Sequence, residues 1–184
     1  VDFTFGLKRY PEPPPPGFVR DSVLGYKARG RWYHPLDIKE CHIAPEGAGA
    51  LLASVRAWMR QHGLRAFDSR RREGFLRALL VREGRRTGQR MAVLITADGP
   101  LDGPVFVEAV RAAYPADSIQ RGIFRGLADV AHAEELEMLH GAPWIEEELR
   151  IPDTGSGGAG PDRVLRFRLS PLSFFQTNTL GAER

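Results

Sequence analysis

Residues 74–97, GFLRALLVREGRRTGQRMAVLITA, restrict the fold of this chain more than any other stretch. Two runs rich in leucine, valine and isoleucine flank a charged turn that contains glycine, which is the pattern of a β-hairpin. A second pair of strands is predicted over residues 23–38, with its turn at Arg29 and Gly30. Residues 1–7, VDFTFGL, alternate apolar and polar side chains as a half-buried strand does. Hairpins are therefore the expected building units of the fold.

Helical spacing of apolar residues occurs in two segments. Residues 50–63, ALLASVRAWMRQHG, place their large apolar side chains on one face, and Gly63 stands where a left-handed C-cap is expected. Residues 103–115, GPVFVEAVRAAYP, predict a second helix that ends at Pro115. Further strands are expected over residues 117–124, 135–141, 144–151 and 164–170. The predicted fold class is α+β: a mixed, mainly antiparallel sheet of sequential hairpins with two main helices, not an alternation of strands and helices.

Charge is unevenly distributed along the chain. The formal net charge of the 184 residues is +3, yet nine arginines fall between Arg65 and Arg90 against three carboxylates. Residues 129–148 are acidic instead. Such asymmetry indicates a polyanionic partner, usually nucleic acid or phosphate. The alternative is an organism that prefers arginine in general, since lysine occurs only at positions 8, 27 and 39.

Other features of the sequence narrow the functional classes. A single cysteine, Cys41, excludes an internal disulfide framework and fits a reducing cytoplasm. It is either a buried, inert thiol or part of a metal site shared with residues outside this chain.

No apolar run approaches the roughly 20 residues that a membrane span needs. Residues 155–160, GSGGAG, match G-x-G-x-x-G, but a proline and a strand follow, so a hairpin loop is expected rather than a nucleotide loop.

Residues 10–18, YPEPPPPGF, interrupt the strand pattern. A proline run cannot donate the hydrogen bonds of a sheet, so this segment is expected to be a stiff, exposed connection between strands. The alternative is a docking segment for a proline-binding partner.

The end of the chain carries a more specific pattern. Residues 169–179, LSPLSFFQTNT, resemble the signature that opens the methyltransferase domain of bacterial RNA uracil-5-methyltransferases, which make 5-methyluridine in ribosomal and transfer RNA. Residues 1–6, 37–46 (DIKECHIAPE), 74–96 and 139–149 (LHGAPWIEEEL) resemble other parts of that family in the same order. The resemblance therefore covers essentially the whole chain.

The resemblance implies an enzyme of three domains that uses S-adenosylmethionine as methyl donor and adds a cysteine thiolate to uracil C6 before C5 is methylated. Residues 1–169 correspond to its central, RNA-facing α+β domain, and residues 170–184 to the start of its Rossmann-like domain. The chain itself would then hold no catalytic residue, because the nucleophilic cysteine and the glutamate base are expected after Arg184. It would be an inactive fragment of a cytoplasmic enzyme. The alternative is a stand-alone, non-enzymatic RNA-binding module.

The resemblance also assigns individual residues. Gln176 matches an amide that hydrogen-bonds the cofactor. Phe174 matches an aromatic residue beside the target nucleotide, with packing in the core as the alternative, while Phe175 is expected to pack against the domain. Cys41 matches the fourth ligand of a 4Fe-4S cluster in the iron–sulfur members of the family, and one thiolate alone would hold no cluster.

RNA would be the partner of the arginines, with ribosomal RNA expected first and transfer RNA as the alternative. Arg77 and Arg82 share a strand at an odd separation, so regular alternation would send them to opposite faces. The residues expected to contact RNA phosphates are Arg70, Arg71, Arg72, Arg85 and Arg86. Such contacts would position the RNA without reading its sequence.

Overall fold

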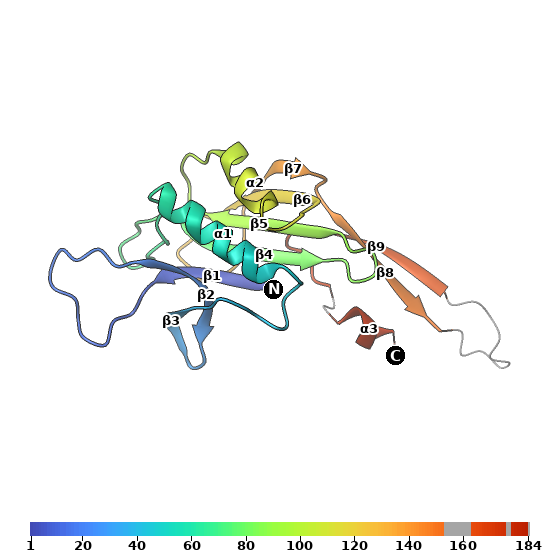
Figure 1. Ribbon diagram of the computed structural model, residues 1–184, viewed down its shortest axis with the longest axis horizontal. Coiled ribbons are helices and arrows are strands. Elements are labelled where there is room, and N and C mark those ends of the chain that lie inside the picture. The colour runs from blue at the N-terminus through green and yellow to red at the C-terminus, as the bar shows by residue number, and fades with distance from the viewer. Residues whose placement is uncertain (153–162, 176–177, 184) are drawn as a thin grey trace.

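The computed structural model describes residues 1–152, 163–175 and 178–183 and consists of a seven-stranded sheet, a separate two-stranded hairpin and three helices in that part of the chain (Figure 1). The order of strands in the large sheet is β3-β2-β1-β4-β5-β6-β7. The strands are β1 (Asp2–Leu7), β2 (Ser22–Ala28), β3 (Arg31–Asp37), β4 (Leu76–Glu83), β5 (Arg90–Thr96), β6 (Ser118–Ile123), β7 (Glu135–Gly141), β8 (Ile145–Ile151) and β9 (Arg163–Leu169). The helices are α1 (Ala48–Gln61), α2 (Gly103–Arg111) and α3 (Thr179–Ala182).

The predicted mixed, mainly antiparallel α+β class is confirmed. Strands β4 and β5 form the predicted hairpin, with Leu80 opposite Val93, and β2 and β3 turn at the predicted position. The expectation of sequential hairpins is wrong at two places, because β4 pairs with β1 rather than with β3 and because β5 and β6 are parallel neighbours. Helix α2 forms the crossover between them, as a parallel pair requires.

Helices α1 and α2 cover one face of the sheet (Figure 1). Phe106 of α2 packs against Trp58 of α1, with ring centroids 4.8 Å apart, over buried residues of β1, β2, β4 and β5. Gly63 has a φ of 60° and donates its amide to Arg60, which confirms the left-handed end of α1. Helix α2 ends at Arg111 rather than at Pro115, so its last predicted turn is wrong.

The opposite face of the sheet is covered in part by the β8–β9 hairpin, whose outer end extends away from the body (Figure 1). Ile145 and Leu169, at the inner end of the hairpin, pack with buried residues of β4 and β5. Ile151 and Val164, near its outer end, are exposed. Apolar packing of the hairpin on the sheet is therefore confined to its inner half.

Arg77 and Arg82 of β4 were expected to point to opposite faces of the sheet, and the structure differs from this prediction. Pairing with β5 shifts between Leu76 and Ala78, so Arg77 lies in a β-bulge. The Arg77 guanidinium lies 4.9 Å from the ring centroid of Phe124, in the same cluster as Ala78. Regular alternation from Ala78 brings Arg82 to this side as well. The two arginines therefore share a face, and the prediction of opposite faces is wrong because the strand is irregular.

Gly74 fixes the loop that joins α1 to β4. It has a φ of 99°, and a Cβ atom there would collide with the carbonyl oxygen of Ala66, which is bridged to Leu76. We expect Gly74→Ala to lower the free energy of unfolding by about 2 kcal/mol, measured by urea denaturation. Gly88→Ala is the matched control, since φ is 72° but the space is open, and about 1 kcal/mol is expected. Equal losses would show that the contact with Ala66 does not matter.

Candidate nucleic-acid interface

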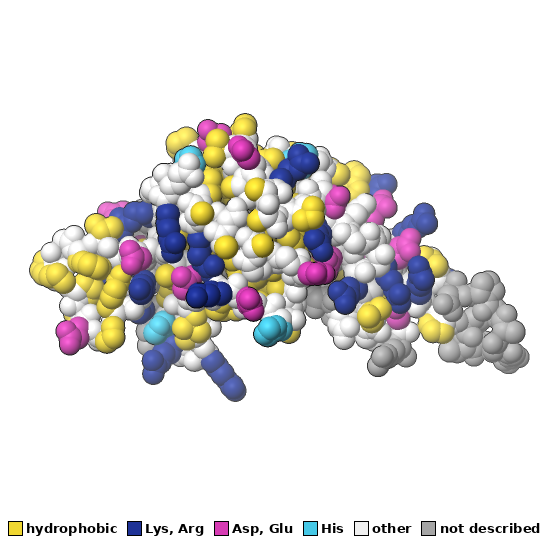
Figure 2. Space-filling model, in the orientation of Figure 1, with side chains coloured by type: hydrophobic (Ala, Val, Ile, Leu, Met, Phe, Trp, Pro, Cys, Tyr) yellow, Lys and Arg dark blue, Asp and Glu magenta, His cyan; other side chains and the backbone are white. Residues whose placement is uncertain are grey.

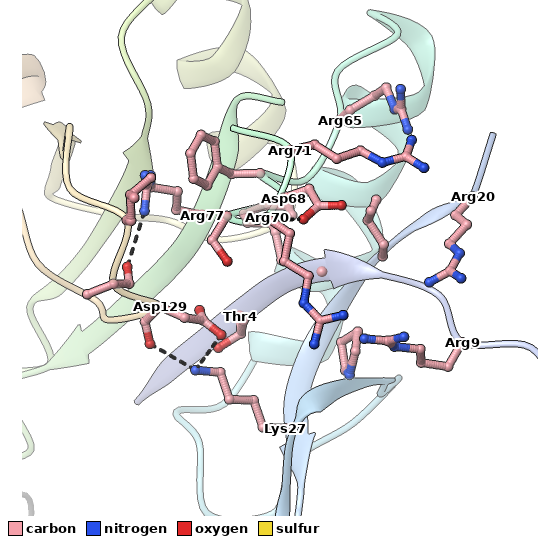
Figure 3. Close-up of a pocket in the computed structure, with 18 of the residues that line it drawn as sticks. Thr4, Arg9, Arg20, Lys27, Arg65, Asp68, Arg70, Arg71, Arg77 and Asp129 are labelled. Atoms are coloured by element: carbon pink, nitrogen blue, oxygen red, sulfur yellow. Dashed lines mark hydrogen bonds and ion pairs between the residues drawn. The ribbon is translucent and has the colours of Figure 1, made fainter. Parts of the chain in front are cut away.

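A basic cleft opens beside β1, between the loop that follows α1 and the loop that follows β6 (Figure 3). Its volume is about 300 Å³. The lining residues come from segments far apart in sequence: 4–7, 9, 18, 20, 27, 35, 65, 67–71, 77 and 127–130. Seven of them are lysine or arginine and two are aspartate, so the cleft concentrates positive charge.

Several of the guanidinium groups in this cleft have no partner. Among the residues that the structure describes, the side chains of Arg20, Arg65, Arg70 and Arg71 form no hydrogen bond and no ion pair. Some arginines elsewhere are paired, as in Arg56 with Asp37 at 2.7 Å and Arg125 with Asp98 at 2.7 Å. Unpaired cations that converge repel one another, and an anion relieves that repulsion. The cleft is therefore built to receive negative charge.

The tight turn at residues 68–73 presents two of these arginines. Asp68 accepts the amide of Arg70 on its carboxylate at 2.9 Å and the amide of Arg72 on its carbonyl oxygen at 2.7 Å. Arg70 and Arg71 line the cleft, whereas Arg72, which has a φ of 58°, is not among the lining residues. The structure thus brings two members of the predicted arginine triplet into the cleft and leaves out the third.

Arg77 forms part of the floor and holds one wall. Only 7% of its surface is exposed, and its guanidinium donates to the carbonyl oxygens of Gly126 and, at 3.3 Å, Ala128. The same group stacks on Phe67 at 3.8 Å from the ring centroid. Burial lowers the pKa of Arg77, and the nearby Asp129 opposes that shift. Arg77 therefore fixes the loop after β6 rather than offering a free charge.

Lys27 closes the cleft at its other end. Its ammonium group contacts both the carboxylate and the carbonyl oxygen of Asp129 at 2.9 Å, and these contacts join β2 to the loop after β6 (Figure 3). Both groups are partly exposed, so the pair contributes little to stability.

Arg85 and Arg86, the other arginines expected at RNA, lie elsewhere. They stand in the β4–β5 turn, eight residues along from Arg77, which corresponds to roughly 25 Å of extended chain. Arg86 pairs with Glu183, with Nε and Oε1 3.1 Å apart, and this hydrogen bond raises the pKa of Arg86. The Arg85 side chain is 64% exposed and lies 3.8 Å from Glu83. The structure does not bring these two arginines to the cleft.

Glu147 instead links the β4–β5 turn to the β8–β9 hairpin. This carboxylate is 1% exposed and accepts the backbone amides of Arg85 and Arg86, the latter at 2.9 Å, and the hydroxyl of Thr179 at 2.8 Å. One buried side chain thus joins the sheet, the hairpin and α3.

We expect Glu147→Ala to lower the free energy of unfolding by about 3 kcal/mol, because the buried donors lose their acceptor. The matched control is Glu148→Ala, whose carboxylate pairs at 3.2 Å with the exposed Arg166 and should cost less than about 1 kcal/mol. Chemical denaturation of both variants checks this ranking, and a Glu147→Ala protein as stable as Glu148→Ala would contradict it.

Cys41 lies near Tyr26, with its sulfur 3.3 Å from the Tyr26 hydroxyl. Burial works to raise the pKa of the thiol, but hydrogen bonds from Tyr26 and from the amides of Ile43 and Ala44 outweigh it, and the net pKa is lowered. In residues 1–152, 163–175 and 178–183, no group of three or more His, Cys, Asp or Glu side chains could hold a metal ion. These residues do not fit an iron–sulfur cluster, which takes four thiolates.

The signature segment near the end is partly described. Phe174 is 93% exposed, which contradicts the alternative of core packing for this side chain in the chain as described. Phe175 packs on Phe167 with ring centroids 5.4 Å apart, as expected. Gln176, assigned to the cofactor, and the 155–160 glycine segment lie outside the described residues.

Comparison with known proteins identifies the relatives of this chain. No family model matches it. It is 29% identical over 164 residues to tRNA (uracil(54)-C(5))-methyltransferase of Pyrococcus furiosus, covering 89% of this chain and 35% of that protein. It is 30% identical over 191 positions to an uncharacterized RNA methyltransferase of Clostridium tetani, covering 100% of this chain and 37% of the relative.

A solved structure shares the fold. The crystal structure of Pyrococcus abyssi tRNA (uracil-54, C5)-methyltransferase in complex with S-adenosyl-L-homocysteine matches 88% of this chain and 36% of that one, with a TM-score of 0.67 and 24% identity. These relatives are RNA methyltransferases by name. The chain is similar, over most of its length, to part of the RNA uracil-5-methyltransferases, and it spans about a third of the length of the relatives it matches.

The sequence indicated only part of the cleft. The dense arginines at residues 65–72 were a visible signal, but Arg9, Arg20 and Lys27 stand in different segments and reach the cleft only through the pairing of β1 with β2 and β4.

In the part of the chain that the structure describes, we find no helix long and apolar enough to cross a membrane.

Proposed function

We propose that this chain is the RNA-holding part of an S-adenosylmethionine-dependent methyltransferase that acts on C5 of a uridine in ribosomal or transfer RNA. The observation that carries the proposal is the cluster of unpaired guanidinium groups in the cleft, within a chain related over its whole length to RNA methyltransferases. The names of the Pyrococcus relatives favour transfer RNA.

In this proposal the chain binds and orients the RNA. Arg20, Arg65, Arg70 and Arg71 neutralise phosphates, which gives affinity and register but no reading of sequence. The exposed ring of Phe174 is proposed to lie beside the target nucleotide, where it can replace the stacking lost when a base leaves its neighbours. Residues 170–184 would begin the domain that follows.

S-adenosylmethionine supplies the methyl group when it is bound, and the complex of the Pyrococcus abyssi enzyme with S-adenosyl-L-homocysteine supports its use. The described residues contain no G-x-G-x-x-G segment between a strand and a helix. We therefore place most of the cofactor site outside them, with Gln176 as the contribution proposed for this chain. An iron–sulfur cluster is not part of the proposal, because the described residues do not fit one.

The experiment uses the whole protein that contains this chain, with S-adenosylmethionine labelled in its methyl group. Unmodified transfer RNA and ribosomal RNA are supplied separately, and nucleosides are analysed by mass spectrometry after digestion. Labelled 5-methyluridine in either RNA is expected. A folded protein that binds RNA but yields none would leave a non-enzymatic RNA-binding module as the better description.

A further inference from the structure

The proline-rich loop between β1 and β2, residues 8–21, is closed at its base by two hydrogen bonds. Lys8 donates its amide to the carbonyl oxygen of Asp21 at 2.8 Å, and the Tyr10 hydroxyl donates to the Asp21 carboxylate at 2.9 Å. Prolines at positions 11 and 13–16 restrict the backbone between them. Figure 1 shows this loop projecting from one end of the sheet. It is a stiff arm whose ends are fixed.

The arm places an aromatic ring at the edge of the basic cleft. Gly17, with a φ of 82°, completes a turn in which Phe18 donates its amide to Pro15 at 3.1 Å. The Phe18 ring is 45% exposed, packs edge-on against Tyr10 at 5.3 Å and lines the cleft together with Arg20. Because the Phe18 ring is already held in place, a ligand that contacts it loses little binding free energy to the ordering of this side chain.

The cleft therefore combines two kinds of surface. Phe18 and Leu127 contribute apolar area, and both are more than 40% exposed, at 45% and 47%. Arg20, Arg70 and Arg71 supply unpaired cations around that area, and Figure 3 shows Arg20 and Arg71 projecting into the cleft from different loops. Aromatic rings interleaved with arginines are the features that bind single-stranded nucleic acid, by stacking and by charge.

We propose that this cleft binds an unpaired nucleotide of single-stranded RNA, with the base stacked on Phe18 and the adjacent phosphates contacted by Arg20, Arg70 and Arg71. This inference rests on the proposed function and specifies the form of RNA that the cleft accepts. A volume of about 300 Å³ is at the small end of ligand sites and suits one nucleotide. Bases in an A-form duplex are stacked on one another and their faces are not available to a side chain.

The test measures fluorescence anisotropy of the chain with two labelled probes, an oligouridine and a fully paired RNA duplex with the same number of phosphates. The oligouridine should bind more tightly. Phe18→Ala should weaken oligouridine binding about tenfold, within the range for loss of one stacked base, and leave the duplex affinity unchanged. Its salt slope should stay as in the parent chain, because no charge is lost.

Two further variants make the result specific. Phe18→Tyr should retain most of the affinity, since the ring is kept. Val19→Ala alters a residue of the same arm that is 63% exposed and does not line the cleft, and its affinity should equal that of the parent chain. The unfolding curves of all three variants should match that of the parent chain, which would show that these substitutions in the arm leave the fold intact.

Equal loss on both probes, or no loss with Phe18→Ala, would overturn this inference and show that the cleft holds backbone phosphates only. Such a result would leave the proposed function standing if the whole protein still makes 5-methyluridine. Failure of the whole protein to bind RNA or to make 5-methyluridine would overturn the proposed function itself, so the two failures are distinguishable.

Discussion

Replacing Arg77 with alanine is expected to lower the free energy of unfolding by about 3 kcal/mol, which is large for a single change. The guanidinium donates to two carbonyl oxygens of the loop after β6 and stacks on Phe67 and Phe124. Alanine leaves those oxygens without a donor and opens a cavity beneath the loop. The burial cost of the guanidinium, whose Nε has no partner among the described residues, offsets part of the gain from these contacts.

Urea denaturation gives the magnitude, and hydrogen exchange of the loop amides gives the location. Arg77→Lys is the matched control: it keeps the charge but loses the planar fork and the stacking, so about half of the loss is expected. Loop amides should exchange faster in the alanine variant than in the lysine variant. An alanine variant within about 0.5 kcal/mol of the parent would mean that Arg77 does not hold this wall of the cleft.

The double variant Arg70→Ala, Arg71→Ala should have the largest effect on RNA binding. Both guanidinium groups line the cleft without partners among the described residues, so their removal takes away phosphate contacts and little folded-state stability. Each contact to a single strand contributes about 0.7 to the slope of log affinity against log salt, and the slope should fall by about 1.4. Titration of labelled RNA at several salt concentrations measures both the affinity and the slope.

Two controls separate the cleft from general surface charge. Arg72→Gly removes a charge next to the cleft and also relieves a left-handed backbone at φ 58°, so it should keep the parent slope and the parent stability or more. Arg85→Ala removes an exposed charge at the far end of β4. If all these variants lower the slope equally per charge removed, RNA binds the surface without a preferred site.

The elements that depend on neighbours in the chain could be predicted from sequence. Gly63 marked the end of α1, and the turn at Arg29 and Gly30 marked the β2–β3 hairpin, because each is fixed by local backbone conformation. The parallel pairing of β5 with β6 could not be predicted in this way, because it depends on how α2 packs across the sheet.

The site was harder to predict than the fold for the same reason. Sequence density identified the arginines of residues 65–90, but charge alone does not say which of them is neutralised. Arg86 pairs with Glu183, 97 residues away, while Arg77 turns to the other face at a one-residue bulge. Arg20 joins Arg70 only because the proline-rich arm returns to the cleft. Pairing across such separations is a property of the folded sheet.

The central claim is that RNA lies in the basic cleft while a uridine is methylated. The most direct measurement is kcat/KM for methyl transfer by the whole protein, comparing the Arg70→Ala, Arg71→Ala variant with Arg72→Gly. We predict a loss of at least about tenfold in the double variant, mostly in KM for RNA, and parent-like values for Arg72→Gly. Parent-like kcat/KM in the double variant, with RNA still methylated, would contradict the claim.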